Sequence, residues 1–496
     1  MAFSQILKRT RKATVPIIEL FGEDDRADAP TTPGMRVNFD KPDTTQSTGA
    51  TTPFIKIAGH IITGVETMII DETGTIPTIT LIFMDSTGGF GGPTFPKKNL
   101  LLSVYLKASN PKFMPLRGDY LITSIKSIVN PKSRGTQSVT KETTYLVKGE
   151  LFVPRLYNNV SKSYSKLTSR DALFKVAEEL GLGFVENDFS TADTMTWINM
   201  NSSPFNFIKD VAKHAYSDDE SFFETFISKE LNLSMVEVSK QLLQLGVDET
   251  FAAAADSLDG DFTQNIKGNP VNESIDETIV GNHLTTDKQN AQSQNYIIEA
   301  SLISKQGEVL KKNGYKKKIY YYDHVLEAEP MEKFQDFYMA PINSQEASAE
   351  NMLIPEDEGL DEIGAKKWMD INYGNTHSQW NAARLINEHN YYELDKLQLR
   401  AVTRGINSQV VRGMSIFTKI TQGVADYLQN DLDPLKQEQL DTTDLTEQDN
   451  VINLQLSGVY YVKGAKYYYD ASSANSLTTE LFLSKREWKS SKKIIK

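Results

Sequence analysis

Hydrophobic residues alternate with polar ones at a period of two in the first third of the chain. Ile79, Leu81 and Phe83 lie at alternate positions in TITLIFM. The same spacing recurs in LLLSVYL at 100–106 and, nearly as regularly, in YLVKGELFV at 145–153. This alternation is typical of antiparallel strands with one buried face, and Gly- and Pro-containing turns separate the segments. The pattern predicts a barrel or sandwich of five or six strands.

The spacing becomes helical in LTSRDALFKVAEELGLGF, residues 167–184. Thr168 and Asp171 have the spacing of a capping box at the start of a helix. Gly181 is placed to end that helix in the left-handed conformation. The apolar residues between these caps fall on one face, so the helix is expected to cover a sheet rather than line a cofactor pocket.

A second helix and a hairpin follow. SPFNFIKDVAKHAY at 203–216 begins with Ser203 as N-cap and a proline in the first turn. FFETFIS at 222–228 and LNLSMVEV at 231–238 read as two short strands. Two amphipathic helices need a sheet to cover their apolar faces, so these segments predict a small α/β domain.

The rest of the chain is divided by polar stretches. Residues 326–365 are acidic and loop-like, and a helix is expected at about 378–389 before strands resume. The predicted organisation is an extended arm at 1–52, a first β-barrel at 53–165, an α/β domain at 166–260, a linker at 261–294, the start of a second barrel with the acidic insertion and helix at 295–394, and a second β-barrel with a basic tail at 395–496. The fold class is therefore α+β and β-rich, with two similar antiparallel β-barrel domains and a small α/β domain inserted.

Composition narrows the possible functions. The chain has 496 residues and no cysteine, which excludes disulfide frameworks, thiolate metal sites and cysteine nucleophiles. Its formal net charge of −12 argues against general nucleic-acid binding. The first 14 residues lack the apolar core of a secretory signal, and no apolar run of 18 residues occurs, so a soluble protein is expected.

No constellation of reactive residues stands out. The six histidines include no pair at the spacing of a zinc helix, and His283 is expected in a solvated loop. The glycine-rich STGGFGGPTF is followed by prolines and a strand instead of a helix, so it reads as a hairpin loop and not as a phosphate site. We expect no catalytic residue, no cofactor and no metal, and we expect a protein that is not an enzyme.

Residues 166–238 resemble the second domain of the central hub proteins of contractile phage tail baseplates, a group that includes the late control protein D type and the hub module of type VI secretion spikes. The resemblance is carried by TSRDALFKVAEELGLGF and SPFNFIKDVAKHAY, and by terminal strands such as LSGVYYVKG and LTTELFLSKREW. The positions that match the packing pattern of the family are Leu173, Val176, Leu180, Gly181, Phe207, Ile208, Val211 and Ala212.

This resemblance implies a structural protein of the virion tail baseplate, assembled in the host cytoplasm. It implies a homotrimer whose two barrels per chain, the first of them of tail-tube type, form a ring of six similar units. Such a ring would adapt the sixfold tail tube to a threefold central spike. The implied partners are the spike protein, the tube or tube-initiator protein, the tape measure protein and inner baseplate proteins, with DNA only in transit and no membrane.

Two other classes of function stay open at this point. One is a virion-associated enzyme that degrades cell wall or polysaccharide, with its acids in the 326–365 insertion. The other is a glycan-binding adhesin built from barrels. Lysis of cell-wall substrate would favour the enzyme, and glycan retention by a monomer would favour the adhesin.

Overall fold

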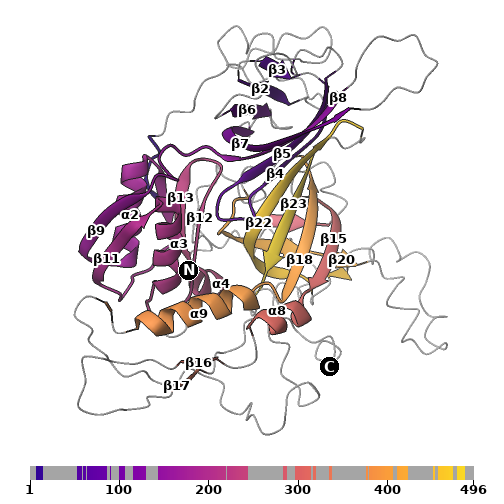
Figure 1. The fold of residues 1–496 in the computed structure, drawn as a ribbon. Helices are drawn as coiled ribbons and strands as arrows, with labels where there is room; N and C mark the ends of the chain where they lie inside the picture. The colour runs from indigo at the N-terminus through magenta and orange to yellow at the C-terminus, as the bar shows by residue number, and fades with distance from the viewer. Residues whose placement is uncertain are drawn as a thin grey trace, which may run out of the picture.

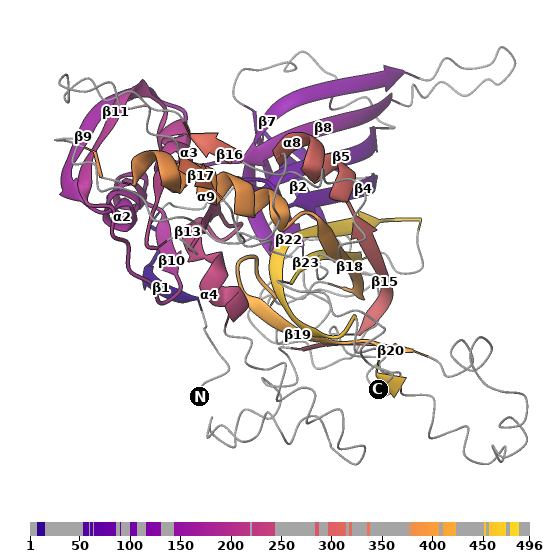
Figure 2. The same cartoon turned by 90° about the horizontal axis from the view of Figure 1, so that it is seen from below.

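A computed structural model shows a long antiparallel sheet, an α/β module beside it, and helix α9 beneath both (Figure 1). From below, α9 is seen to cross from the α/β module toward α8 and the sheet (Figure 2). The structure describes residues 7–14, 53–58, 60–62, 64–85, 90, 100–106, 116–129, 143–218, 221–243, 283–286, 296–313, 317–319, 335–337, 376–377, 379–405, 410–422, 451–452, 456–472 and 477–485.

The first β unit forms one end of a 13-stranded sheet. The alternation in TITLIFM has the predicted effect, since Ile79, Leu81 and Phe83 are all buried. The order of strands across this unit is β4-β5-β8-β7-β6-β2-β3. Its strands are β2 (Phe54–Ile57), β3 (His60–Ile62), β4 (Val65–Asp71), β5 (Thr78–Asp85), β6 (Leu101–Leu106), β7 (Leu116–Val129) and β8 (Thr143–Leu151).

The second β unit forms the other end of the same sheet. Its order is β15-β18-β23-β22-β19-β14. Gly405 directly follows β18 and Gly413 lies shortly before β19, and both have the positive φ that favours glycine. Its strands are β14 (His283–Thr285), β15 (Ile297–Ser304), β18 (Leu397–Arg404), β19 (Ser415–Lys419), β22 (Gly458–Asp470) and β23 (Leu477–Ser484).

The two units share one topology. Going along the chain, β2, β4, β5, β6, β7 and β8 correspond to β14, β15, β18, β19, β22 and β23, and their order across the sheet is also the same. The units differ at one side, because β2 runs antiparallel to β6 whereas β14 runs parallel to β19. They also differ in one connection. In the first unit β5 follows β4 directly, whereas in the second unit α8 (Gln306–Asn313) and α9 (Trp380–Glu393) lie between the equivalent strands β15 and β18.

The α/β module contains the helices predicted from the sequence. Helix α2 (Ser169–Leu180) begins at Thr168, whose hydroxyl accepts from the Asp171 amide, and ends at Gly181 with φ 72°. Helix α3 (Pro204–His214) begins at Ser203. The remaining elements are β1 (Lys8–Arg11), β10 (Gly183–Glu186), β12 (Phe223–Ile227) and β13 (Asn232–Glu237) in one sheet, the pair β9 (Val160–Leu167) and β11 (Met195–Ser202), and the short helix α4 (Val238–Leu243).

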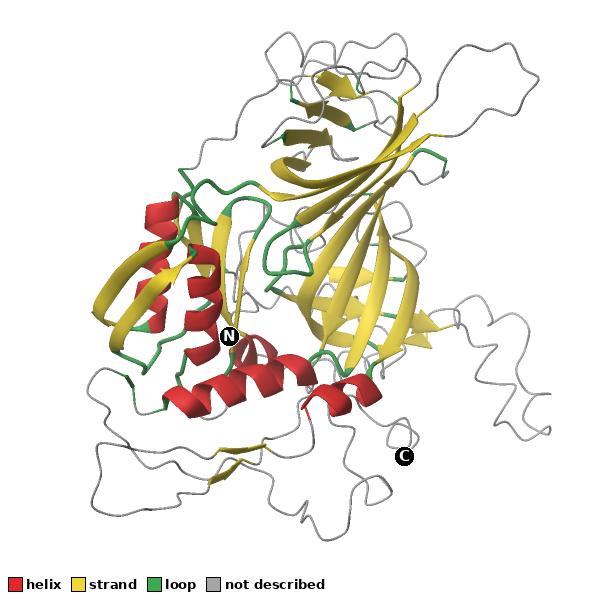
Figure 3. Ribbon diagram, viewed as in Figure 1, coloured by secondary structure: helices red, strands yellow, loops and turns green. Residues whose placement is uncertain are grey.

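Helices gather on the module side and below, while the other side of the molecule is almost entirely strands (Figure 3). One cluster of buried apolar side chains extends through both β units and the module. Two short pairs complete the described elements: β16 (Lys317–Ile319) with β17 (Gln335–Phe337), and β20 (Thr421–Gln422) with β21 (Val451–Ile452).

The β-rich α+β class predicted from the sequence is confirmed. Among the described residues the strands form one continuous path from β15 to β3, and no strand closes either unit into a ring. The two units are joined into this path by β22, which is 13 residues long and reaches past its own unit to pair with β4.

Two segments expected to be irregular contain strands. Residues 283–285 of the predicted linker form β14, so His283 lies in a strand and not in a solvated loop. Residues 8–11 of the predicted arm form β1, an edge strand antiparallel to β10. Thr14 extends this contact, because its amide donates to the carbonyl of Gly181 at 2.7 Å. The acidic insertion at 326–365 lies outside the described residues, apart from residues 335–337.

Candidate assembly surfaces

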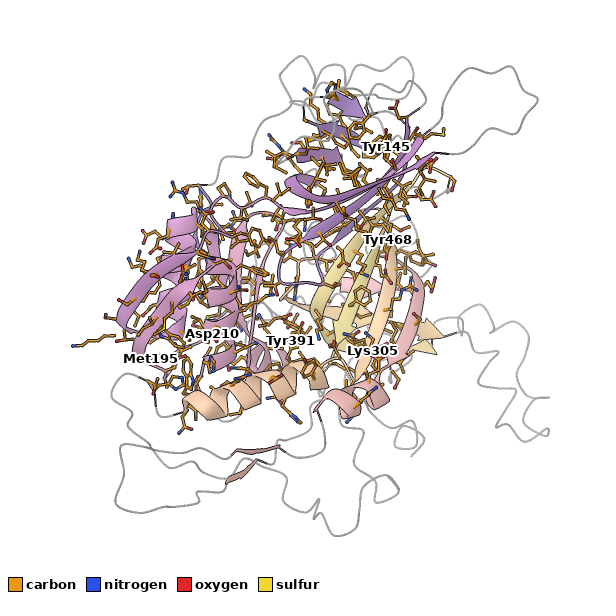
Figure 4. The ribbon with its side chains drawn as sticks, in the orientation of Figure 1. Tyr145, Met195, Asp210, Lys305, Tyr391 and Tyr468 are labelled. Atoms are coloured by element: carbon orange, nitrogen blue, oxygen red, sulfur yellow. The ribbon has the colours of Figure 1, made fainter. Side chains whose placement is uncertain are left out.

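The two β units are joined edge to edge by β22. Its first part pairs with β19, and its last five residues pair with β4 on the same edge, from Lys466 opposite Asp71 to Asp470 opposite Thr67. Lys466 and Asp71 also form an ion pair, with 3.2 Å between Nζ and Oδ2. Tyr468, in the middle of this ladder, is labelled in Figure 4 where the two units meet. We call this ladder the in-chain joint.

A buried ion pair supports the in-chain joint from the α/β module. The Lys229 ammonium lies 3.2 Å from the Glu72 carboxylate, and both side chains are buried. Lys229 also donates to the Tyr467 hydroxyl at 3.0 Å. Burial alone would lower the pKa of Lys229, but the carboxylates of Glu230 and Glu72 outweigh it and hold that pKa above its usual value. The cation therefore stays charged at a point where the β12–β13 hairpin, β4 and β22 meet.

Arg412, just before β19, makes a second buried link, from the second β unit to the end of β4 and to the β12–β13 hairpin. Its guanidinium donates to the Glu224 carboxylate at 2.6 Å and to the Glu72 carbonyl at 2.9 Å. It also lies over the ring of Phe226, at 4.4 Å from the centroid. The following residue, Gly413, has φ 88°, and a Cβ there would lie 3.0 Å from the Phe226 ring. A side chain at 413 would thus be disfavoured by both conformation and space.

Helix α9 is held against α3 by one asparagine. The Asn387 side-chain amide donates to the carbonyls of Lys213 and Ala215 at 2.9 and 2.8 Å, and its oxygen accepts from the Phe223 amide at 2.9 Å. These bonds use carbonyls that the end of α3 leaves without helical partners. Asn387 therefore connects α3, α9 and β12 at a single buried point.

Two histidines and a tryptophan lie at the same contact. The ring of His214 stacks on that of Trp380, with centroids 3.6 Å apart and planes 5° apart. His377 Nε2 donates to the carbonyl of His214 at 3.1 Å, and His214 Nδ1 donates to the carbonyl of Asp210 at 2.9 Å. Burial lowers the pKa of both histidines.

The positions that match the hub family lie in the core of the α/β module. Their side chains come from α2 and α3, which pack on each other and on the module's sheets, so they cover a sheet as the sequence predicts. Leu173, Val176, Leu180, Phe207, Ile208 and Val211 are buried, Gly181 caps α2, and Ala212 is half-buried.

The residues that support the in-chain joint were not identified from the sequence. Lys229 reads as a turn residue between two strands, and Arg412 reads as part of a turn near glycine. Each is an ordinary charged residue in a polar context, and no spacing relates it to a partner some 150 or more positions away. Only the folded arrangement brings them together.

Besides the three-residue end strands β3 and β14, two strand edges of the long sheet have no partner within the described part of the chain. One is the outer edge of β15, which pairs only with β18. The other is the second half of β7, where Ser124–Val129 pair with β8 on one side while β6 reaches only as far as Leu121 on the other. Large apolar side chains are exposed on both strands, with Ile128 at 44% and Leu302 at 46%.

Across the described ranges, no three His, Asp or Glu side chains come together as a metal site would require. No helix in those ranges has both the length and the apolar character to span a bilayer.

Comparisons with known proteins give structural neighbours only. No family model matches the chain, and no curated protein matches it in sequence. The 43 kDa tail protein of prophage MuSo2 from Shewanella oneidensis is 9% identical, with a TM-score of 0.44 over 88% of this chain and 98% of that one. A tail protein from Neisseria meningitidis MC58 is 9% identical, with a TM-score of 0.41 over 87% of this chain and 96% of that one.

A third neighbour is the E. coli c3393 protein, a component of the type VI secretion system described as structurally similar to the T4 tail proteins gp27 and gp5. It is 11% identical, with a TM-score of 0.37 over 88% of this chain and 78% of that one. The structural neighbours are thus phage tail and type VI secretion proteins, the group to which the sequence resemblance points. TM-scores of this size carry no argument about function.

Proposed function

We propose that this chain is a structural, non-enzymatic component of a contractile phage tail, and that it acts as the hub of the baseplate. In this role three copies form a ring that adapts the sixfold tail tube to a threefold central spike. We also propose the domain division predicted from the sequence, in which the two β units are the parts that form the ring. The virion tail is the proposed location.

The observation that supports this proposal is the duplicated topology. Six strands of the first unit and six of the second follow the same order along the chain and nearly the same pairing across the sheet. Three chains with two such units each would present six similar units to a sixfold partner while keeping threefold symmetry for another. Duplication within a chain is a direct way to make closed rings that satisfy both symmetries.

The partners proposed are the spike on the threefold side and the tube or tube-initiator protein on the sixfold side. Tape measure and inner baseplate proteins are proposed as further contacts. DNA would pass through the bore without being bound, and the net charge of −12 agrees with a lumen that repels it. This part of the proposal would be wrong if neutralising bore-facing acids left DNA passage unchanged.

The test of the ring is a mass measurement with imaging. Light scattering of the purified full chain should give three times its mass of 55.7 kDa. Averaged electron-microscope views down the axis should show six lobes that alternate in shape. A monomer, or a particle without threefold symmetry, would contradict the hub.

A further inference from the structure

The two β units agree in register as well as in order, and this agreement can be followed residue by residue. The β7–β8 ladder slips between Ile122 and Ser124, and the β22–β23 ladder slips between Val462 and Gly464. When the two bulges are superimposed, Leu121 corresponds to Tyr461. Those two residues are each the last to pair with the preceding strand, β6 in one unit and β19 in the other. β-bulges are specific features of a fold, so this coincidence marks equivalent positions.

The same match continues across four strands. Opposite residues in the first unit run Ile122, Gly149, Ile79 and Ile70, from β7 through β8 and β5 to β4. In the second unit they run Val462, Leu483, Leu399 and Leu302, from β22 through β23 and β18 to β15. Ile70 therefore corresponds to Leu302.

A bulge at the far end of these rows checks the match independently. The β4–β5 ladder slips between Val65 and Thr67, and the β15–β18 ladder slips between Ile297 and Glu299. When Ile70 is aligned with Leu302, the two register shifts fall at equivalent positions. The equivalence of β4 with β15 thus follows from two bulges at opposite sides of each unit.

In the first unit β4 is covered by β22, but the equivalent contact of the second unit is open. Ile70 is fully buried in the in-chain joint, whereas Leu302 is 46% exposed. The partner strand shows the same contrast. Tyr467, in the second half of β22, is buried, and its counterpart Ser127 in β7 is exposed. Among the described strands, neither open edge has the partner that its counterpart has.

The open edge of β15 also lacks the usual protection against pairing. Soluble proteins guard long edge strands with lysine, proline or inward charges. The strand IIEASLIS has neither proline nor lysine, and its one charged residue, Glu299, is paired with Arg400 on the neighbouring strand. An eight-residue edge of this composition is suited to accept another strand.

We propose that β7 of one copy of this chain pairs with β15 of the next copy and so repeats the in-chain joint between chains. This inference rests on the ring proposed above and specifies how its copies meet. The register carried over from the in-chain joint places Lys126 opposite Ile303, Ser127 opposite Leu302, Ile128 opposite Ser301, and Val129 opposite Ala300.

The side chains in this register are complementary. Leu302 lies opposite the small Ser127 on one face, while Ile128 lies diagonal to Ile303 on the other. Diagonal neighbours in antiparallel ladders are within reach of long apolar side chains. The joint is also asymmetric, since each copy contributes β7 to one neighbour and β15 to the other. An asymmetric contact of this kind builds rings instead of two-fold dimers.

Cysteine pairs in the full chain test the joint, because the chain has no cysteine of its own. One variant combines Ser127→Cys with Leu302→Cys, and a second combines Ile128→Cys with Ser301→Cys. Neighbouring pairs alternate between hydrogen-bonded and non-hydrogen-bonded sites, so at least one of these pairs has geometry suited to a disulfide. Mild oxidation should give covalent dimers and closed trimers on a non-reducing gel, at least about tenfold above each single-cysteine variant.

The matched control combines Ile128→Cys with Ile298→Cys, which is similarly exposed at 40% but three positions out of register. Equal cross-linking of this control, or cross-linking of a single-cysteine variant, would overturn the proposed joint. Light scattering on the same samples separates the two proposals. A trimer without in-register cross-links overturns the β7–β15 joint and leaves the ring, whereas a monomer overturns the ring itself.

Discussion

The in-chain joint and the open edges of β7 and β15 are two versions of one arrangement, and they differ in what covers them. In the in-chain joint, β4 has strands on both sides, and it is supported by Lys229 of the α/β module and by Arg412 of the second β unit. Among the described strands, the corresponding strand β15 pairs with β18 alone, and it carries exposed Ile298 and Leu302. Because the two units share one topology, the strand contact that is covered in the first unit shows which contact is missing in the second.

The largest effect is expected from removing the cation behind the in-chain joint. Arg412→Met leaves the Glu224 carboxylate, 3% exposed, without its ion pair. Breaking a buried pair on one side costs about 3–5 kcal/mol, because the remaining charge stays buried. Urea unfolding measures the loss. Arg400→Met is the matched control, since that guanidinium is 32% exposed, and it should cost clearly less. Equal losses would show that Arg412 has no special part in supporting the joint.

Truncation of equivalent residues should separate the two copies next. Ile70→Ala removes a fully buried side chain and should cost about 2–5 kcal/mol of unfolding free energy. Leu302→Ala, at the matching position of β15, should cost about 0.5 kcal/mol or less in dilute, monomeric protein. Thermal and urea unfolding at low concentration provide the measurement. Similar costs at both positions would mean that the β15 edge is already covered in the monomer.

Acid should weaken the contact between α3 and α9. His214 faces Asp210 and Arg384, and His377 faces Asp193. Because burial lowers both pKa values below the ordinary value of about 6.5, the unfolded chain binds more protons in mild acid. Stability is then complete above about pH 6.5 and is lost as the pH falls below it, by less than either substitution above. Unfolding free energies from pH 7.5 to 5.5 check this, and His377→Asn should make the slope shallower. An unchanged slope would mean that His377 does not contribute.

The smallest effect concerns the ion pair across the in-chain joint. Lys466 and Asp71 are each 28% exposed, and a double-mutant cycle should give a coupling of about 0.2–1 kcal/mol that decreases with salt. The matching positions in the proposed joint between chains are Lys126 and Ile303, which cannot form such a pair. Added salt should therefore weaken the in-chain joint slightly. Dissociation of the ring should not depend on salt in this way, because the joint between chains has no equivalent ion pair. A coupling of several kcal/mol would mean that the pair is more strongly desolvated than its exposure indicates.

The features that could be predicted from the sequence are those that depend on residues close together in the chain. Helix α2 has both caps within the chain segment that forms it, at Thr168 and Gly181, so its ends were predicted correctly. Strand β5 alternates between buried and partly exposed positions, and that period is readable in any sequence. The resemblance to hub proteins likewise depended on short packing patterns in α2 and α3.

Long-range pairings could not be read in this way. Nothing in the sequence of β22 shows that its first half pairs with β19 and its second half with β4. Strand β14 is three residues long in a polar stretch, and it is a strand because β19 offers it a parallel partner. Lys229 and Arg412 acquire their roles only when three distant segments meet, which no local period encodes.

The bond from Arg412 to Glu224 has a consequence for biosynthesis. The two residues are 188 positions apart, so the ribosome exposes the carboxylate long before its cation is made. Until then Glu224 favours water over the interior, and the β12–β13 hairpin has reason to stay loosely docked. A nascent chain, or one terminated before Arg412, would therefore be held back from its final packing, which delays assembly of copies until this part of the second β unit has been made.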